Sequence, residues 1–328
     1  MTTVSSLYVP VADDLQLVED TLALTARTDF APLQEMLEAV LSRGGKRLRP
    51  AIALLAGAFG SYDAQNQVLL ATSIELLHTA TLVHDDVIDT AQTRRGHPTV
   101  NARFDNAASV MLGDYMFAHA AELVARTGHV AVIRLFAQTL KTMATGELQQ
   151  DIRAYDAESA SMRDYYGRIH GKTASLFETA GRGGAMMAGA PAETVAALGE
   201  YGRCLGMAFQ IVDDVLDFTA TAAALGKPVG GDLLAGTLTL PSILLMESAA
   251  GEAVVRRLFA AQEVAEREAL LGEALGAIRS GDILTRSQAT ALEWRERAVG
   301  SLSGLGPGDR GERAALEGIA AFVVERGF

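Results

Sequence analysis

The sequence predicts an all-α fold, and three observations support this prediction. Only 8 of the 328 residues are prolines, which leaves long stretches without a residue that interrupts a helix. Alanine and leucine are more frequent than the β-branched residues, and strand-like alternation is scarce. Mostly apolar side chains also recur at helical spacing, in the sets Leu70, Ile74, Leu77, Thr81 and Val132, Leu135, Thr139, Met143.

Four segments carry the glycines, prolines and polar clusters typical of loops. They cover residues 42–50, 93–98, 219–241 and 301–313. The helical pattern resumes after each segment, and none has the composition of a low-complexity linker. We therefore expect a single domain over residues 1–328, in which the glycines of residues 226–236 mark the best candidate for a mobile loop.

The composition excludes several classes of function. Hydrophobic residues make up 49% of the chain, and 40 acidic against 28 basic residues give a net charge of −12, so we expect no binding to nucleic acid or anionic lipid. No apolar run is long enough to span a membrane, and the single Cys204 cannot form an internal disulfide. The first basic residue is Arg27, which is untypical of a secretory signal or transit peptide. We expect the protein to be cytoplasmic.

Two acidic motifs lie in otherwise apolar helical segments. They are LLHTATLVHDDVIDTA over residues 76–91, with Asp85, Asp86 and Asp89, and FQIVDDVLDF over residues 209–218, with Asp213, Asp214 and Asp217. The first and last aspartate of each motif share a helix face and repel each other unless a cation lies between them. Mg²⁺ binds through one or two carboxylates, waters and phosphate oxygens. A capped helix end explains either motif alone, but the pair favours an Mg²⁺ site.

Basic residues lie in glycine-containing segments that suit phosphate binding. Three of the four lysines do so: Lys46 in GGKRLRP, Lys172 in GKTASLF and Lys227 in LGKPVGGD. The planar guanidinium groups available for bidentate contact are those of Arg47, Arg49, Arg94 and Arg95. Each of these residues alone is explained by ordinary solvated surface. Together with the aspartate motifs, they predict a site for phosphate groups and Mg²⁺.

These motifs together resemble those of the all-trans polyprenyl diphosphate synthases, the prenyltransferases that elongate isoprenoid chains. The likeness covers about residues 44–241 in the family's order: GGKRLRP, HDDVIDTAQTRRGHPTVN, GDYMFA, GKTASLF, FQIVDDVLDF and LGKPVGGDL. It implies a bundle of long helices around a deep central cavity, with both aspartate motifs facing each other across its mouth, and a homodimer. Residues from about 251 to 328 carry no such motif, and we expect them to be helical.

The resemblance also implies a role for each matching residue. The Mg²⁺ ligands would be Asp85, Asp89 and Asp213, supported by Asp86, Asp214 and Asp217. The diphosphate of isopentenyl diphosphate would be held by Lys46, Arg49, His78 and Arg95. The allylic diphosphate would be held by Arg94, Lys172 and Lys227, with Thr173 and Gln210 near the developing carbocation. The family often has a lysine where this chain has Thr237, so we expect a changed affinity for the allylic diphosphate, not a loss of activity.

Product length depends in this family on residues just before the first aspartate. Short-chain members usually have an aromatic residue four or five positions before it, where this chain has Thr81 and Ala80. With Leu77 a turn further down, these small or aliphatic side chains predict an open tunnel and a product of roughly thirty to forty-five carbons, as in quinone side chains. Alternatives are a farnesyl or geranylgeranyl diphosphate synthase, a non-catalytic partner subunit, a terpene cyclase or a purely structural helical protein. The intact motifs disfavour the last three.

Overall fold

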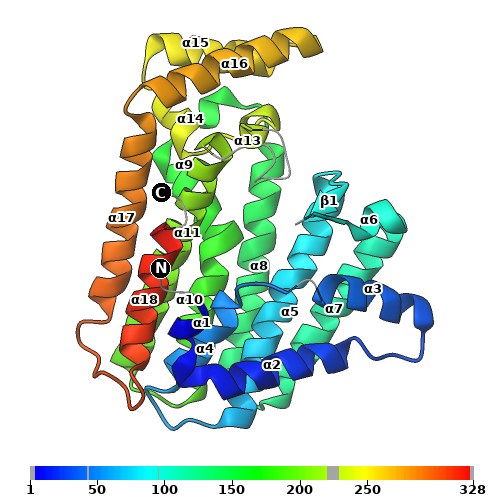
Figure 1. Ribbon diagram of the computed structural model, residues 1–328, viewed down its shortest axis with the longest axis vertical. Helices are drawn as coiled ribbons and strands as arrows, with labels where there is room; N and C mark the ends of the chain where they lie inside the picture. Colours follow the sequence, from blue (N-terminus) through cyan, green and yellow to red (C-terminus); the bar gives the residue numbers. More distant parts are fainter. Residues whose placement is uncertain (1–3, 43, 95, 220–228, 326–328) are drawn as a thin grey trace. The chain divides into compact units, whose positions relative to one another are not determined.

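The structure confirms the all-α fold. It is a computed structural model that describes residues 4–42, 44–94, 96–219 and 229–325. Helices follow one another through the described residues (Figure 1). The first half contains α1 (Val4–Leu7), α2 (Ala12–Thr25), α3 (Ala31–Leu41), α4 (Leu48–Gly57), α5 (Ala64–Ile88), α6 (Val100–Arg103), α7 (Asn106–Arg126) and α8 (Val130–Ile152). The second half contains α9 (Met162–Ile169), α10 (Ser175–Met187), α11 (Ala192–Thr219), α13 (Gly231–Leu234), α14 (Leu240–Leu245), α15 (Ala249–Ala260), α16 (Val264–Ser280), α17 (Ile283–Ser301) and α18 (Glu312–Glu325).

Short elements connect these helices. They are the 3₁₀ turns η1 (Val9–Val11) and η2 (Ala157–Ser159), the π-helical turn η3 (His170–Ala174), and the antiparallel strands β1 (Thr93–Arg94) and β2 (His97–Pro98). The segments expected as loops largely lie between helices, but the segment 219–241 contains α13 and the start of α14. Residues 220–228 lie outside the described residues, so only the part of the expected mobile loop from residue 229 onward can be compared with the structure.

The chain divides into two compact units. Unit 1 comprises the described residues within 1–139, 176–202 and 301–319, and unit 2 those within 140–175, 203–300 and 320–328. The single domain expected from the sequence stays a prediction. Within the described residues, no helix combines the length and the apolar character needed to cross a membrane.

The core of unit 1 is built around α5. Residues 67–77 of this helix are all buried, and hydroxyl groups among them donate to carbonyl oxygens four residues back, so burial leaves them satisfied. Helix α7 packs along α5 (Figure 1). A glycine permits this close approach, because a Cβ atom on Gly113 would lie 2.1 Å from Nε2 of His84. The packing anchors the end of α5, which carries the first aspartate motif.

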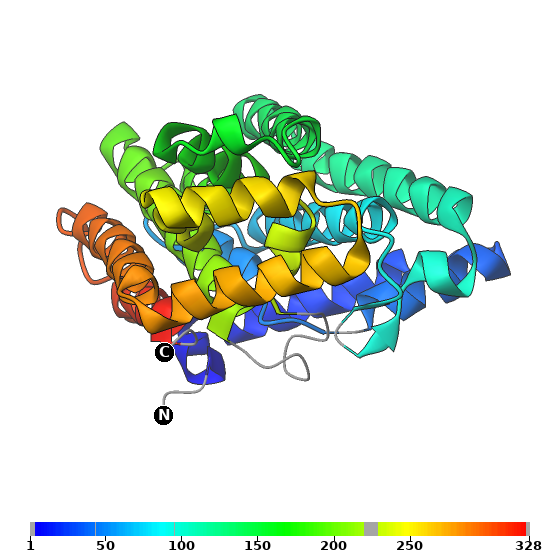
Figure 2. The ribbon, with the colours of Figure 1, turned by 90° about the horizontal axis from the view of Figure 1, so that it is seen from above.

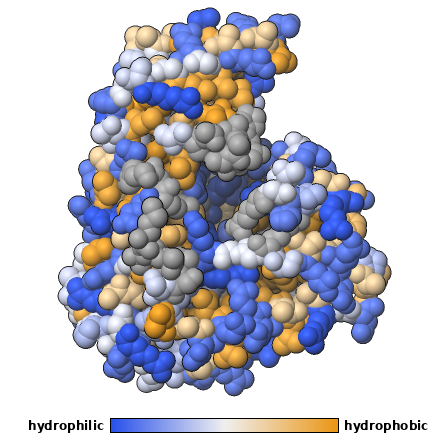
Figure 3. Space-filling model, in the orientation of Figure 1, coloured by the Kyte–Doolittle hydropathy of each residue, from blue (hydrophilic) through white to orange (hydrophobic). Residues whose placement is uncertain are grey.

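The core of unit 2 brings η3 against α8. A Cβ atom on Gly146 of α8 would lie 2.8 Å from the backbone nitrogen of Lys172, so only glycine lets these backbones approach so closely. Helices α15 and α16 run side by side (Figure 2). Apolar side chains gather on the side of α16 near α13 and α14 (Figure 3), where Leu271 and Leu275 approach Gly230. These helices therefore support the turn that follows the second aspartate motif.

Candidate active site

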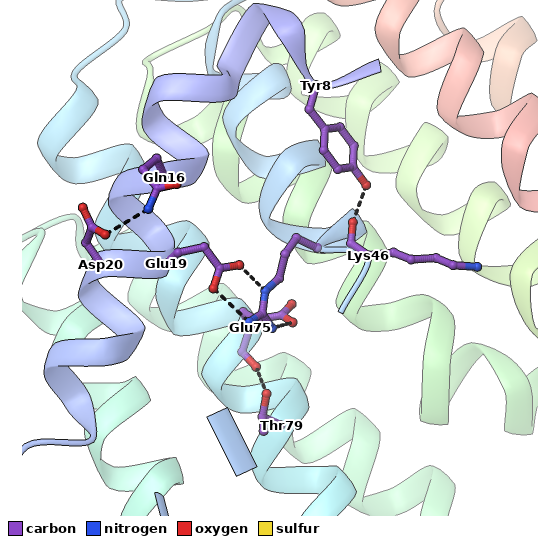
Figure 4. A network of polar contacts seen from close by, with 8 residues as sticks. Tyr8, Gln16, Glu19, Asp20, Lys46, Glu75 and Thr79 are labelled. Carbon is purple, nitrogen blue, oxygen red and sulfur yellow. Dashed lines mark hydrogen bonds and ion pairs between the residues drawn. The ribbon is translucent and has the colours of Figure 1, made fainter. Parts of the chain in front are cut away.

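Residues 44–47 of the GGKRLRP segment precede α4 without regular secondary structure, and a buried ion-pair network holds them. Arg47 has a left-handed backbone, with φ of 47°, and its guanidinium donates to Glu19 of α2 and to Glu75 of α5. The Nη1–Oε1 distance to Glu75 is 2.7 Å, and the Nη2–Oε2 distance to Glu19 is 3.0 Å. The Tyr8 hydroxyl donates to the carbonyl oxygen of Lys46 (Figure 4). The adjacent residues Lys46 and Arg47 are thereby tied to α2, α5 and the N-terminal segment.

The electrostatics of this network keep Arg47 charged. Burial alone lowers the pKa of the Arg47 guanidinium, but the hydrogen bonds and charges of Glu19 and Glu75 outweigh it and raise that pKa. Burial, followed by the charge of Glu75, raises the pKa of the Tyr8 hydroxyl. The side chain of Lys46 is exposed and extends away from the network (Figure 4). Arg47 is therefore paired with carboxylates of its own unit. The sequence groups Arg47 with the arginines suited to phosphate and does not predict this pairing.

The first aspartate motif occupies the C-terminal turn of α5. Asp89 is exposed as the C-cap and its backbone nitrogen donates to the carbonyl oxygen of Asp85 at 2.8 Å, so the two carboxylates lie one helical turn apart. Asp86 is buried and accepts from Nε of Arg94 at 2.6 Å. The β1–β2 hairpin returns Arg94 to the end of α5 for this contact. The hairpin thus places a cation beside the motif.

The second aspartate motif belongs to unit 2 and begins a chain of hydrogen bonds. The Tyr165 hydroxyl donates to Oδ2 of Asp214 at 2.6 Å, and Nε2 of Gln210 donates to Oδ1 of the same carboxylate at 2.8 Å. The amide oxygen of Gln210 accepts from the Thr173 hydroxyl at 2.7 Å. Burial, with the negative charge of Asp232, raises the pKa of Asp214 to about 7. These hydrogen bonds fix the orientation of the Gln210 side-chain amide.

The remaining aspartates of this motif differ in environment. Asp213 is half-buried on α11, whereas Asp217 is buried and its Oδ2 accepts from the backbone nitrogen of Asp232 at 3.2 Å. The backbone nitrogen of Gly230, which has a left-handed φ of 72°, donates to the carbonyl oxygen of Asp217. Asp217 therefore organises the turn that follows the motif.

Lys172 and Thr173 lie on the π-helical turn η3. Such widened turns are rare and often occur at functional sites. Nζ of Lys172 donates to Oε2 of Glu147 on α8 at 2.8 Å. Sequence reasoning missed Glu147, because nothing in its local sequence signals a partner 25 residues away. The structure therefore joins Lys172 to α8 and Thr173 to α11.

Other residues with expected roles are located as follows. Arg49 and His78 are half-buried in unit 1, and Arg95 and Lys227 lie outside the described residues. Among the residues expected to set chain length, Leu77 and Ala80 are fully buried on α5, and the half-buried Thr81 donates its hydroxyl to the carbonyl oxygen of His78. Their tunnel role stays a prediction.

The aspartate motifs offer carboxylate oxygens to a metal ion. Within the described residues, no group of three or more His, Cys, Asp and Glu side chains is arranged to hold a metal ion by itself. Mg²⁺ does not need such a group, because it commonly uses one or two carboxylates and completes its shell with water and substrate phosphate oxygens. The pair Asp85 and Asp89, one turn apart at an accessible helix end, fits that mode of binding.

Comparisons with known proteins agree with this arrangement. The chain is 37% identical to heptaprenyl diphosphate synthase component 2 of Geobacillus stearothermophilus, over 98% of this chain and 99% of that protein. It is also 37% identical to octaprenyl diphosphate synthase of Haemophilus influenzae, over 96% and 94% of the two chains. A solved polyprenyl synthase of Caulobacter crescentus, in complex with calcium and isoprenyl diphosphate, superposes with a TM-score of 0.91 at 32% identity, over 99% and 98% of the two chains.

The family model described as Polyprenyl synthetase matches residues 31–275, which include both aspartate motifs and all of the basic motifs. The chain therefore belongs to the polyprenyl synthetase family and is a prenyltransferase of the polyprenyl diphosphate synthase type.

Proposed function

We propose that this prenyltransferase is a long-chain all-trans polyprenyl diphosphate synthase that adds isopentenyl diphosphate repeatedly to an allylic diphosphate and depends on Mg²⁺. The observation that carries the proposal is the completeness of the motifs, since residues 31–275 contain both DDxxD sequences and every basic segment unbroken. The names of the relatives, heptaprenyl and octaprenyl diphosphate synthase, support a long product.

We assign Mg²⁺ binding to Asp85, Asp89 and Asp213, supported by Asp86, Asp214 and Asp217. Carboxylate oxygens suit this hard cation, and substrate phosphate oxygens complete its shell. When bound, Mg²⁺ stabilises the negative charge that develops on the leaving diphosphate. The Caulobacter crescentus relative was solved with calcium, another hard cation with oxygen ligands, which supports this assignment.

We assign the diphosphate of isopentenyl diphosphate to Lys46, Arg49, His78 and Arg95, and the allylic diphosphate to Arg94, Lys172 and Lys227. Arg94 and Lys172 are oriented before substrate binds, because each is paired with a carboxylate of its own unit. A diphosphate then competes with these carboxylates for the same charged groups. The pairs therefore orient the two cations before the substrate binds, and they lower the affinity of these cations for diphosphate.

The reaction needs stabilisation of the charge on the leaving diphosphate, and it needs no nucleophilic side chain from the protein. The allylic C–O bond breaks with its electron pair moving to the diphosphate, where the basic side chains stabilise the charge. The double bond of isopentenyl diphosphate attacks the allylic cation, and loss of a proton to the released diphosphate restores a double bond. Thr173 and Gln210 provide fixed dipoles beside the cation, because their mutual hydrogen bond and Asp214 hold them in one orientation. Exclusion of water prevents capture of the cation.

We further propose a product of roughly thirty to forty-five carbons, with Leu77, Ala80 and Thr81 lining the path of the growing chain along α5. We also propose a homodimer and a cytoplasmic location. A second candidate is a subunit of a two-component synthase, which the name "component 2" of the Geobacillus stearothermophilus relative favours.

One experiment separates these candidates. Purified protein is incubated with Mg²⁺, isopentenyl diphosphate and farnesyl or geranylgeranyl diphosphate, and the products are analysed by mass spectrometry. Products of about six to nine isoprene units are expected. A limit of fifteen or twenty carbons would keep the reaction but contradict the open tunnel, and the absence of product with any primer would support the two-component candidate.

A further inference from the structure

Unit 2 contains a cavity of about 220 Å³ whose lining residues, apart from Thr237, have no substrate role assigned so far. It lies where the end of α8 and the start of α9 meet residues 236–238. Its polar wall includes Gln150, Arg153, Arg163, Asp164, Arg168 and Thr237. Tyr165, whose hydroxyl donates to Asp214, also lines the cavity and so links it to the second aspartate motif.

The charge around this cavity is strongly positive for so acidic a chain. Three arginines and one aspartate line it, in a protein whose net charge is −12. Arg153 and Asp164 are paired at 2.7 Å, and that contact lowers the pKa of Asp164, which keeps it charged. Within the described part of the chain, neither Arg163 nor Arg168 has a carboxylate within ion-pair distance. Two guanidinium groups without a direct ion-pair partner therefore lie beside an open volume, and Arg168 acts on the charge of Asp214 only at longer range.

Arg168 is held by hydrogen bonds to two uncharged groups. Its Nη1 donates to the amide oxygen of Gln150 at 3.2 Å, and its Nη2 donates to the carbonyl oxygen of Leu238. Its guanidinium lies 5.6 Å from the centre of the Tyr165 ring. A guanidinium has five N–H donors, and these contacts use two of them among the described residues. The others are available to an oxyanion, the ligand that suits a planar fork of donors.

The wall beside Arg168 is also fixed. Gly236 has a left-handed φ of 79°, and a Cβ atom there would lie 2.5 Å from the backbone nitrogen of Tyr155. The backbone nitrogen of Thr237 donates to the carbonyl oxygen of Asp232 at 2.8 Å. The half-buried Thr237 thus presents an uncharged side chain at a defined point of the wall, next to the carbonyl group that holds Arg168.

We propose that this cavity binds a phosphate or diphosphate oxyanion, with Arg168 as its principal ligand and Arg163 as a second cation. The chemistry fits two sources that the proposed function supplies, the diphosphate of a prenyl substrate and the inorganic diphosphate released in each cycle. The identity of the source rests on the proposed function, whereas the binding of an oxyanion does not.

The first test measures binding of inorganic diphosphate to the full-length protein by calorimetry, without divalent metal. We expect Arg168→Gln, which removes the guanidinium charge, to weaken one class of sites by about tenfold or more. Adding Thr237→Lys to this variant should restore much of the affinity, because the ammonium enters the same cavity. Arg286→Gln, an exposed arginine paired with Glu247 and outside the cavity, is the matched control and should bind as the unaltered protein does.

The second test identifies the source by steady-state kinetics. A raised KM for the allylic diphosphate in Arg168→Gln, with unchanged inhibition by inorganic diphosphate, assigns the cavity to substrate; the reverse pattern assigns it to released diphosphate. Rescue by Thr237→Lys would not occur if Arg168 only supported the fold, and circular dichroism checks that each variant keeps its helices. Unchanged diphosphate binding in Arg168→Gln, or failure of Thr237→Lys to rescue a folded variant, would overturn the proposal. If the unaltered protein has no prenyltransferase activity, the calorimetry still decides whether the cavity binds diphosphate.

Discussion

Replacing Arg47 with methionine tests the buried network beneath the GGKRLRP segment. Arg47 and Glu75 expose only 10% and 7% of their side chains, whereas Glu19 exposes 40%. The substitution removes the guanidinium group. The buried Glu75 carboxylate is then left without its cation and with little access to water. Neither residue is glycine, so the left-handed backbone at position 47 is disfavoured in both proteins, and the comparison isolates the loss of the charged group.

The two halves of the network contribute unequally. Breaking a buried ion pair by removing one partner costs about 3 to 5 kcal/mol, which applies to the pair of Arg47 with Glu75. The carboxylate of Glu19 regains water when Arg47 is removed, so its share is at most about 1 kcal/mol. We therefore expect Arg47→Met to lower the free energy of unfolding by about 3 to 5 kcal/mol, most of it through Glu75.

Urea denaturation followed by circular dichroism measures this loss. Adding Glu75→Gln to Arg47→Met should recover more than about 1 kcal/mol, because it removes the uncompensated charge. The exposed pair Arg286 and Glu247 provides the control, and Arg286→Gln should change the stability by about 1 kcal/mol or less. An Arg47→Met protein as stable as the unaltered one, or a double variant less stable than the single one, would refute the reasoning.

Four further changes have defined outcomes. Asp85→Ala should abolish Mg²⁺-dependent condensation while circular dichroism stays unchanged, and near-normal turnover would contradict the metal assignment. Ala80→Phe should shorten the product seen by mass spectrometry, so an unchanged distribution would exclude Ala80 from the tunnel. Gln210→Leu should lower kcat more than it raises KM, because it breaks the link between Thr173 and Asp214; a pure KM effect would argue against a role beside the cation. Burial, the largest influence, lowers the pKa of His119 below 6.5, so the folded protein favours the neutral imidazole and should lose stability as the pH falls below that value. His119→Gln should weaken this pH dependence of the thermal unfolding temperature. An equal pH dependence in the variant would contradict the role of His119.

The position of the aspartate motifs along helices could be predicted from local patterns. The spacing of Asp85 and Asp89 implies a shared helix face, and the structure has both at the C-terminal turn of α5. The glycines before Lys46 predict a loop, and the structure has irregular backbone there that ends in the left-handed Arg47. The pairing of Arg47 with Glu19 and Glu75 was not predicted. A single glutamate in the apolar run before the first motif was the available signal, since a buried carboxylate needs a partner.

The sequence by itself determined the helical periodicity, the family motifs and the type of chemistry, because each depends on residue types at short fixed separations. Only the tertiary structure decided which charges are already paired. Lys172 meets Glu147 across 25 residues, Thr173 meets Gln210 across 37, and Arg168 meets the Leu238 carbonyl across 70. Such partners are selected by how helices pack and where glycines let backbones approach, as at Gly146. Helical spacing carries no information on contacts of that range, so the cavity around Arg168 could be found only in the folded chain.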